Sequence, residues 1–542
     1  MTSKNILFVV ITIAFFLRFW HLGDNPPSLA WDEAAWGYNA YTLGIDGRDE
    51  FGKLLPLVYI ESFGDYKPPV YAYLSVVPVK LFGLTEFAVR FPSAFFGVLT
   101  VLVTYSLVKR IFPDTKYIAL LSAFFLSISP WHINLSRAAF EANVATFFLV
   151  TGVWLFVSGV VEQKGRGKWY FIFSAISFVL SMYTFNTSRI VAPLLVAALA
   201  IGFRKQLFVR KKEVLIAVFV GIILFAPLFR FLLTPEARLR FQEVNIFSDV
   251  GVIARTNKEI INDDNAWWSK VIHNRRVAFV VEYTKHYLDH FNPDFLFIKG
   301  DGNPKFSTQD VGQLYLWELP FFVAGILFLL RKKAGFWWII PAWLLIALIP
   351  AGTARETPHA LRIETALPTF QIIVALGVTH AMEFASHMRA KNILYGLFAI
   401  LLAFNVLYYL HGYHTHYPRE FSGEWQYGYK ETVLFTKEHY GEYEKFFITN
   451  AVGRPYIYYL FYNKTSPQDF RKTAQITKDP QGFTHVDGFG KYVFTNNVGE
   501  FLNPIKPYLY LDTAGRVATK AKVVKEFYLL NGYPIYVTYR FY

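Results

Sequence analysis

The sequence predicts an α-helical polytopic membrane protein with about eleven transmembrane helices, followed by a small α/β domain. Apolar residues make up 54% of the 542 residues and recur in long runs, most of which can cross a bilayer as helices. Residues 412–542 have mixed polarity and contain no such run. We therefore expect a membrane module at residues 1–411 and an extracytoplasmic domain at residues 412–542.

The first apolar run covers residues 6–22 and follows Lys4. Ser28-Leu29-Ala30 resembles a signal-peptidase site, but the run is long for a signal peptide. It also contains Arg18, whose side chain can extend from the end of a retained helix to water. We expect this run to be the first membrane span.

A polar, aromatic and charged loop at residues 23–71 follows the first span. Within it, Trp31, Ala35, Tyr38 and the pair Tyr41-Thr42 recur at roughly helical spacing. This pattern predicts a short helix that lies in the membrane interface with its aromatic face among the headgroups. A simple exposed helix explains the pattern equally well.

Ten further apolar runs complete the membrane module, and the segments between them are short except for the long loop at residues 234–313. The runs lie at about residues 91–111, 117–134, 141–161, 169–186, 189–203, 213–233, 314–330, 335–351, 364–386 and 391–411.

Basic residues gather in five short segments that all fall on the same side of the membrane when the spans are counted in order. They are Lys109, Arg110, Lys116, Lys164, Arg166, Lys168, Arg204, Lys205, Arg210, Lys211, Lys212, Arg331, Lys332, Lys333, Arg389 and Lys391. Because positive residues favour the cytoplasmic side, this side and the N-terminus are predicted to be cytoplasmic. The loops at 31–71 and 234–313 and the C-terminal domain are then outside.

The C-terminal domain is predicted to combine one helix at 424–440 with several strands. Four runs rich in aromatic and β-branched residues have the composition of strands: 446–450, 456–462, 524–530 and 535–541.

The composition excludes several classes of function. The 54 basic and 40 acidic side chains give a net charge of +14, but the basic residues form no long stripe of the kind that binds nucleic acid. The chain has no cysteine, so it cannot form disulfides, thiolate nucleophiles or cysteine metal ligands. His411, His414 and His416 lack a nearby carboxylate at close spacing, so a metal site there is not favoured.

Ionisable residues recur at the predicted outer ends of the spans, beside Asp32 and Lys67 of the first outer loop. Such groups are costly at a membrane boundary unless they are paired or used, so they are candidate site residues. The remaining candidates are Glu33, Tyr66, Arg90, Arg137, Glu141, Arg189, Arg355, His359 and Arg362. Alternatives stay open for several of them: Arg90 can be a helix-end anchor, Glu33 can cap or orient without touching substrate, and Arg137 with Glu141 can be a self-neutralising pair.

This set of residues fits sugar transfer from a lipid phosphate. Arginine binds phosphate through two parallel hydrogen bonds. A carboxylate such as Asp32 can act as general base on an acceptor hydroxyl. The phosphate leaving group needs positive side chains for its developing charge, so the reaction does not require a divalent metal, although one can be accommodated.

Several short motifs occur in a fairly specific order along residues 1–411. They are Asp32-Glu33, Tyr66-Lys67-Pro68-Pro69-Val70-Tyr71, Val89-Arg90-Phe91-Pro92-Ser93-Ala94, Ser136-Arg137 followed by Glu141, and His359-Ala360-Leu361-Arg362. In order and topology they resemble GT-C glycosyltransferases of the protein O-mannosyltransferase and lipid A aminoarabinose transferase type.

The resemblance implies that Asp32 is the catalytic carboxylate (Asp or Glu in the family) of the first external loop and that Lys67, as in the aminoarabinose branch, contacts the lipid phosphate. Glu141 stands where both branches often have aspartate. Residues 234–313 do not resemble the lumenal insert of eukaryotic protein mannosyltransferases, which favours a bacterial or archaeal host.

The sequence thus predicts a membrane glycosyltransferase that moves a sugar, with inversion, from a polyprenyl-phosphate donor to an extracytoplasmic protein, lipid or glycan acceptor. Asp32 is the predicted base, and Lys67, Arg137 and Arg362 are the predicted donor ligands. A lipid-linked-sugar transporter or flippase is the alternative, but it would place ionisable residues in mid-span and show an internal repeat. A non-catalytic membrane scaffold would leave the loop between Asp32 and Lys67 unexplained.

Overall fold

The computed structural model describes residues 2–113, 115, 117–162, 165–237, 245–479, 483–497, 507–515 and 522–541. The topology prediction also used Lys116 and Lys164, which lie outside this set. The chain divides into two compact units. We call residues 1–17, 96–135 and 141–409 the helical unit, and residues 18–95, 136–140 and 410–542 the sheet unit.

The predicted domain boundary at residue 411 stays a prediction, but the two units divide the chain differently. Residues 18–95, which include the first outer loop, group with the C-terminal residues. The reason is packing, since the helix at Pro455–Asn463 lies against the helix at Trp31–Asp46.

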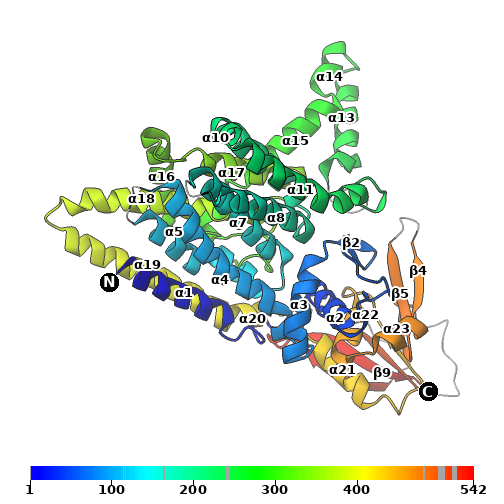
Figure 1. The fold of residues 1–542 in the computed structure, drawn as a ribbon. Coiled ribbons are helices and arrows are strands. Elements are labelled where there is room, and N and C mark those ends of the chain that lie inside the picture. The colour runs from blue at the N-terminus through cyan, green and yellow to red at the C-terminus, as the bar shows by residue number, and fades with distance from the viewer. Residues whose placement is uncertain are drawn as a thin grey trace. The chain divides into compact units, whose positions relative to one another are not determined.

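Apolar helices form most of the helical unit (Figure 1). They are α1 (Ser3–Phe19), α4 (Glu86–Ile111), α5 (Ile118–Ile128), α6 (Pro130–Arg137), α7 (Glu141–Val161), α8 (Gly167–Thr184), α9 (Ser188–Gly202), α10 (Arg204–Val209), α11 (Lys211–Leu232), α16 (Glu318–Lys332), α17 (Ile339–Leu348), α18 (Thr369–Ser386) and α19 (Lys391–His411); α1, α4, α6 and α19 continue into the sheet unit.

Helices α16 and α18 pack so closely that only glycine fits at two facing positions. A Cβ atom on Gly325 would lie 1.9 Å from the carbonyl oxygen of Ile373, and one on Gly377 would lie 1.9 Å from that of Phe321. Small residues that let helix backbones approach closely are typical of helix packing in membranes.

Four described helices are long and apolar enough to cross a membrane, and a fifth span results if the bent pair α5 and α6 counts as one. The four spans are Glu86–Ile111, Glu141–Val161, Lys211–Leu232 and Lys391–Glu420. Shorter apolar helices occur at Val70–Phe82, Ser188–Gly202 and Ile339–Thr353. The membrane-protein class is therefore supported, whereas the number of about eleven spans stays a prediction.

The long predicted outer loop of the helical unit is itself largely helical. Its elements are η1 (Ile246–Ser248), α13 (Val250–Asn262), α14 (Trp267–Ile272), α15 (Arg275–Asp289) and η2 (Asp294–Ile298); two further short turns, η3 (Ala351–Thr353) and η4 (Glu364–Ala366), lie between α17 and α18.

The sheet unit contains a small hairpin, a mixed sheet and the helices around them. Its helices are α2 (Trp31–Asp46), α3 (Val70–Phe82), η5 (Gly412–His416), α20 (Tyr417–Glu420), α21 (Tyr429–Glu438), α22 (Pro455–Asn463) and α23 (Pro467–Thr473). Its strands are β1 (Ile60–Ser62), β2 (Asp65–Lys67), β3 (Lys445–Ile448), β4 (Gln475–Lys478), β5 (Thr484–Phe489), β6 (Tyr492–Phe494), β7 (Tyr508–Thr513), β8 (Lys522–Tyr528) and β9 (Pro534–Phe541).

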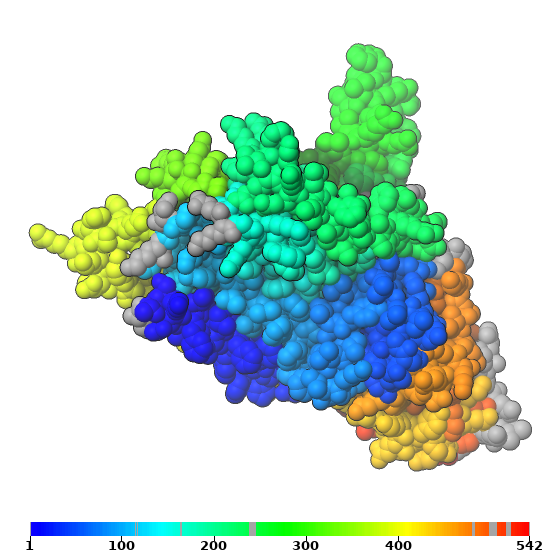
Figure 2. All heavy atoms as spheres, viewed as in Figure 1, coloured from blue at the N-terminus to red at the C-terminus, as the bar shows by residue number. Residues whose placement is uncertain are grey.

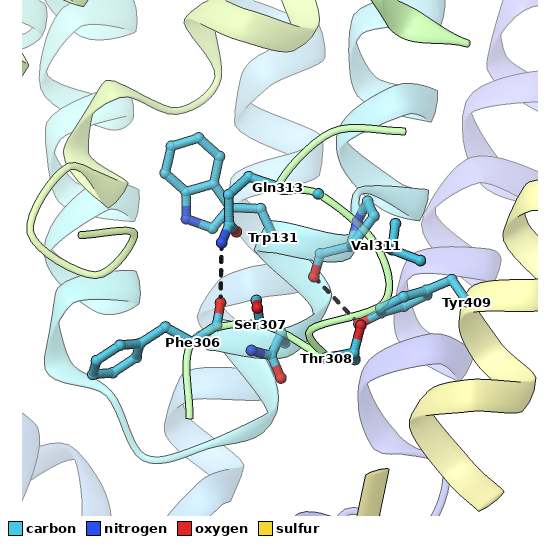
Figure 3. A pocket seen from close by; sticks show the side chains of 10 residues that line it. Trp131, Phe306, Ser307, Thr308, Val311, Gln313 and Tyr409 are labelled. Atoms are coloured by element: carbon cyan, nitrogen blue, oxygen red, sulfur yellow. Dashed lines mark hydrogen bonds between the residues drawn. The ribbon is translucent and has the colours of Figure 1, made fainter. Parts of the chain in front are cut away.

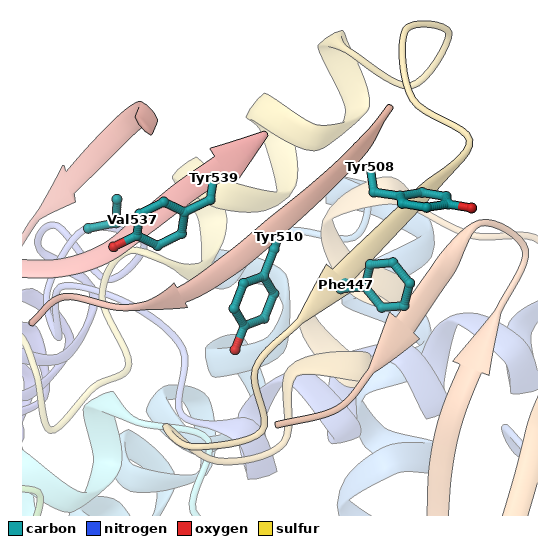
Figure 4. Packing of buried hydrophobic residues seen from close by; sticks show 5 residues of the cluster. All are labelled: Phe447, Tyr508, Tyr510, Val537 and Tyr539. Atoms are coloured by element: carbon teal, nitrogen blue, oxygen red, sulfur yellow. The ribbon is translucent and has the colours of Figure 1, made fainter. Parts of the chain in front are cut away.

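Seven strands form one sheet in the order β4-β5-β6-β3-β7-β9-β8, in which β3 runs parallel to both of its neighbours. Alternate residues of three adjacent strands pack together on one face (Figure 4). Tyr510 stands opposite Phe447 on one side and Tyr539 on the other. The small C-terminal sheet that the sequence predicted is therefore present.

Three of the four predicted strands are found, as β3, β8 and β9. The prediction for residues 456–462 is wrong, because this run forms α22. Pro455 occupies the first turn of α22, where proline is well tolerated. The residues from Pro455 to Phe461 are all buried, so the aromatic run reflects burial on every side of a helix and not the two faces of a strand.

The short helix predicted near Trp31 is present as α2. Of its predicted aromatic face, Tyr38 is buried, whereas Trp31 and Tyr41 are half-buried. Helix α2 packs against α3 and α22 within the sheet unit. Its predicted position among lipid headgroups stays a prediction.

Candidate active site

Asp32 lies in the first turn of α2. The N-terminus of a helix carries unsatisfied N–H groups and the positive end of the helix dipole, which favour acidic side chains. Asp32 and Glu33 are the two acidic residues of this turn. The start of α2 thus holds two adjacent carboxylates, and their surroundings differ.

Lys67 lies on β2, which a tight turn connects to β1. Phe63 and Gly64 form the two-residue turn and both have positive φ angles, 62° and 75°, as a hairpin turn of this type requires. A Cβ atom on Gly64 would lie 2.4 Å from the backbone nitrogen of Thr484, so only glycine fits there. The turn fixes Lys67 opposite Ile60.

Asp32 and Lys67 form an ion pair between Oδ1 and Nζ. The Lys67 side chain is only 10% exposed, whereas that of Asp32 is 49% exposed. The Lys67 ammonium also lies 4.9 Å from the ring centre of Phe63 and 5.4 Å from that of Trp36, a favourable position for a cation. The pair therefore combines a firmly held cation with a carboxylate that solvent reaches.

Glu33 is buried, and both of its carboxylate oxygens accept hydrogen bonds. Oε1 accepts hydrogen bonds from Arg90 Nε at 2.9 Å and from Ala139 N at 2.8 Å, and Oε2 accepts from Arg90 Nη2 and Ala30 N. Arg90 donates in addition to the carbonyl oxygens of Leu22, Pro26 and Ser28. Glu33 and Arg90 thus join the stretch from Leu22 to Glu33, helix α4 and the segment at Ala139, and their predicted roles in substrate binding stay predictions.

Arg137, at the end of α6, is also buried and donates hydrogen bonds to the protein itself. Its guanidinium donates to the carbonyl oxygens of Arg18 at 3.2 Å and Asn25 at 3.0 Å, and to the Tyr413 hydroxyl at 3.3 Å. These contacts join the segment after the first apolar helix to η5. The predicted role of Arg137 as a donor ligand stays a prediction.

Tyr66 precedes Lys67 on β2 and is half-buried. Its ring packs edge-on against Tyr59 with 5.0 Å between ring centres. Tyr66 and Lys67 point to opposite sides of the strand, as successive strand residues do.

Glu50 is a buried carboxyl that the sequence analysis did not single out. It accepts hydrogen bonds from Tyr456 Oη at 3.1 Å and Asn39 Nδ2 at 3.2 Å. Burial raises its pKa to about 8, although the Tyr456 and Ser62 hydrogen bonds and the nearby Lys67 ammonium oppose the shift. Nothing in the local run around Glu50 indicates burial, since it lies among charged and glycine residues.

The C-terminal part of the sheet unit contacts the first outer loop through polar side chains. Arg471 forms an ion pair with Asp46 and donates to the carbonyl oxygen of Asp49 at 2.7 Å. Arg454 donates to the carbonyl oxygen of Phe63 at 3.1 Å. Since Phe63 belongs to the turn before Lys67, these contacts fix the backbone on which Lys67 stands.

The other predicted site residues lie in the helical unit: Glu141, Arg189, Arg355, His359 and Arg362. Arg189 Nε donates to the carbonyl oxygen of Met182 at 3.4 Å, and Arg362 Nη1 donates to that of Glu356 at 3.3 Å. Arg355 Nε donates to the carbonyl oxygen of Asn245 at 3.1 Å. Their predicted roles in substrate binding stay predictions.

His359 belongs to a buried polar group in the loop between α17 and α18. Its backbone N–H donates to His290 Nε2 at 3.2 Å, and its ring lies beside Asp301, with 3.8 Å between Nδ1 and Oδ2. Burial holds the pKa of His359 well below its usual range and raises the pKa of Asp301 to about 6. Asp301 Oδ2 also accepts from Ala360 N, so this group fixes the loop that carries Arg362.

A small hollow of about 160 Å³ lies nearby in the helical unit (Figure 3). Trp131, Asn134, Phe306, Gln313 and Tyr409 are among its lining residues. Gln313 and Tyr409 donate hydrogen bonds to the carbonyl oxygens of Phe306 and Pro130 across it. Its polar groups thus bond to one another, and it has no charged lining residue, so we do not assign it to the site.

Within the described residues, no group of three or more His, Cys, Asp or Glu side chains is arranged to hold a metal ion. Of the three histidines considered above, His411 and His416 approach each other, with 3.3 Å between their Nε2 atoms.

Residues 66–231 match the model of the family described as dolichyl-phosphate-mannose-protein mannosyltransferase. An uncharacterized protein of Aquifex aeolicus (strain VF5) is 30% identical over 192 residues, which are 35% of this chain and 36% of that protein. The putative mannosyltransferase YkcB of Bacillus subtilis (strain 168) is 29% identical over 132 residues, 24% of this chain and 17% of YkcB. Each alignment therefore covers only a minor part of the relative.

Two solved structures share the fold. ArnT from Cupriavidus metallidurans bound to undecaprenyl phosphate aligns over 99% of this chain and 98% of its own, with a TM-score of 0.55 and 11% identity. The oligosaccharyltransferase of Archaeoglobus fulgidus in complex with zinc and sulfate aligns over 84% of this chain and 61% of its own, with a TM-score of 0.51 and 16% identity.

At these identities the structural likeness concerns the fold alone. Together with the four helices that can cross a membrane, it supports a helical membrane protein. The predicted orientation of the termini stays a prediction. The family match and the shared fold confirm the resemblance predicted from the sequence, to the GT-C superfamily of glycosyltransferases that use polyprenyl-phosphate-linked sugars.

Proposed function

We propose that this protein transfers a sugar from a polyprenyl-phosphate donor to a hydroxyl-bearing acceptor outside the cytoplasmic membrane, with inversion at the anomeric carbon. The observation that carries the proposal is the Asp32–Lys67 pair, in which the carboxylate is open to solvent and the ammonium is held among rings. The family match of residues 66–231 and the ArnT-like fold support it.

In this mechanism Asp32 accepts the proton of the acceptor hydroxyl while the hydroxyl oxygen attacks the anomeric carbon. The bond between that carbon and the phosphate oxygen breaks, and its electron pair leaves with the polyprenyl phosphate. Lys67 stabilises the charge that develops on the phosphate. One displacement with one base inverts the anomeric centre.

Residues whose hydrogen-bonding groups are already used within the protein have positioning roles in this mechanism. Glu33 and Arg90 fix the first turn of α2 and thereby the direction of Asp32. Arg454 and Glu50 fix the hairpin that carries Lys67. The donor-binding roles of Arg137 and Arg362, and the secondary roles of Tyr66 and Glu141, belong to the same proposal. The acceptor class, whether protein, lipid or glycan, is left to the experiment.

The test is a transfer assay with a panel of radiolabelled polyprenyl-phosphate sugars and total membrane acceptors. We expect wild type to consume one donor and Asp32→Asn to lose about 100-fold to 10,000-fold of that rate, the usual contribution of a general base. Lys430→Met, which removes an exposed ion pair with Glu86, serves as a control that keeps the rate.

Donor binding is measured in parallel, because the two roles predict different results. Asp32→Asn should still bind the donor, whereas Lys67→Met should bind it more weakly. Turnover of Asp32→Asn at the wild-type rate would refute the base assignment. Movement of intact lipid-linked sugar across the bilayer without bond cleavage would instead favour the flippase.

A further inference from the structure

Three helices of the helical unit form a projecting arm, residues 250–289, that the proposed reaction does not use. It consists of α13, α14 and α15, and it extends away from the other helices of its unit, as the green segment in Figures 1 and 2. Its tip is α14 with the adjoining start of α15.

The base of the arm is fixed to α17 and to the segment that follows it. Tyr287 Oη donates to the carbonyl oxygen of Leu345 at 2.8 Å, and Tyr283 Oη donates to that of Ile349 at 3.2 Å. His286 Nδ1 hydrogen-bonds the carbonyl oxygen of Ala354 at 2.8 Å. The arm therefore leaves the helical unit from a rigid attachment.

Three acidic side chains of the arm have partners within it. Glu259 lies 2.8 Å from His273 Nδ1, Asp263 accepts from Ser269 Oγ at 2.7 Å, and Glu282 pairs with Arg255. These contacts join α13 to α14 and to α15. Asp264, between α13 and α14, is exposed.

Large apolar side chains are exposed at the tip of the arm. Trp267 is 81% exposed and Val271 is 61% exposed, and further exposed apolar residues on the arm are Val250, Ile261, Trp268, Ile272, Val277, Val280 and Val281. Three basic residues, Lys270, Arg275 and Arg276, are exposed among them. Residues 265–281 contain no acidic residue.

We propose that the tip of the arm docks on the surface of the lipid bilayer, with the tryptophans in the interfacial layer and the three basic residues against lipid phosphates. Tryptophan prefers the boundary between hydrocarbon and headgroups. An apolar helix face flanked by lysine and arginine binds lipid surfaces through burial and charge. A bilayer is available as the partner, because the same unit contains helices long enough to span one.

The absence of cysteine in the chain permits a direct test, because one introduced cysteine can be labelled without background. A nitroxide is attached to Val271→Cys in the full chain in phosphatidylglycerol–phosphatidylcholine nanodiscs. Its accessibility to oxygen, which partitions into lipid, is compared with its accessibility to a water-soluble nickel chelate. Ile222→Cys on α11 is the lipid reference, and Glu442→Cys on the C-terminal domain is the water reference.

We expect the oxygen-to-nickel ratio at position 271 to resemble that at position 222 and to exceed that at position 442 several-fold. Adding Trp267→Ser and Trp268→Ser should lower the ratio toward the water reference. A water-like ratio at position 271 would overturn the proposal. Protection from both reagents would also overturn it, because it would indicate a protein partner or a second copy of the chain. The readout does not depend on sugar transfer.

Discussion

Two ion pairs start from neighbouring residues of the same helical turn and have opposite surroundings. Glu33 and Arg90 are 1% and 0% exposed and use their hydrogen-bonding groups within the protein, whereas Asp32 is half exposed and opposite Lys67. A buried, saturated pair can only hold structure, and an open one can take part in chemistry. Of these two neighbouring residues, Glu33 thus fixes the helical turn and Asp32 faces the solvent.

The largest effect is expected from breaking the buried pair. Arg90→Met leaves Glu33 as an uncompensated buried charge, and such a change typically costs about 3–5 kcal/mol of folding free energy. Thermal or denaturant unfolding in one detergent measures it. Lys430→Met is the matched control, because it breaks a partly exposed pair whose loss costs about 1 kcal/mol or less. Equal losses in the two variants would contradict this comparison.

A pH-dependent effect of intermediate size is expected from Glu50. Its carboxyl has a pKa of about 8 in the folded protein against an ordinary value of 4.5. Between these values the folded state keeps a proton that the unfolded state has released, so raising the pH favours unfolding by up to about 1.4 kcal/mol per pH unit.

Glu50→Gln removes this titration. We expect the stability of wild type to fall from pH 5 to pH 8 more steeply than that of the variant, measured by unfolding at several pH values in the same detergent. Parallel curves for the two proteins would show that Glu50 is ionised throughout this range.

A smaller effect is expected from Tyr456, which donates to Glu50. Tyr456→Phe leaves the carboxyl with one hydrogen bond fewer, at a cost of about 1 kcal/mol. Because that bond lowers the pKa of Glu50, its loss should also extend the pH-dependent fall in stability to higher pH. Tyr533→Phe, at an exposed position, is the control, and an unchanged pH profile in Tyr456→Phe would argue against the coupling.

The smallest effect on stability is expected from Asp32→Asn. Exposed substitutions usually change the folding free energy by about 0.5 kcal/mol or less, and Asp32 faces solvent. The same variant is expected to lose most activity, so stability and transfer rate should separate. A loss of stability as large as that of Arg90→Met would show that the Asp32–Lys67 pair is structural.

The sequence predicts Asp32 as the base and places Glu33 beside it, and these roles stay predictions, but it does not predict which of the two carboxylates is buried. Which carboxylate is buried depends on Arg90, which is 57 residues away, and on the backbone N–H of Ala139. The helical membrane-protein class, the small C-terminal sheet and three of its strands followed from hydropathy and composition, whereas the number of spans stays a prediction. Which residues pair with each of these carboxylates depends on tertiary contacts that no local sequence pattern encodes.

The same limit explains the two misses in the sheet unit. The run from Tyr456 to Tyr462 is rich in aromatic residues, which favour strands on average, yet burial on all sides makes it a helix. Glu50 lies in a stretch typical of a solvated loop, yet it is buried and has hydrogen-bond partners in Tyr456, Asn39 and Ser62. In both cases the deciding neighbours are distant in sequence.

Arg471 pairs with Asp46 across 425 residues of chain. A ribosome builds the chain from its N-terminus, so Asp32 and Lys67 emerge long before the arginines and tyrosine that fix their loop. The site should therefore mature only near the end of synthesis, and a chain interrupted before residue 454 should be inert even with its membrane helices inserted. For the proposed transfer reaction, we therefore expect completion of the polypeptide to be a condition for activity.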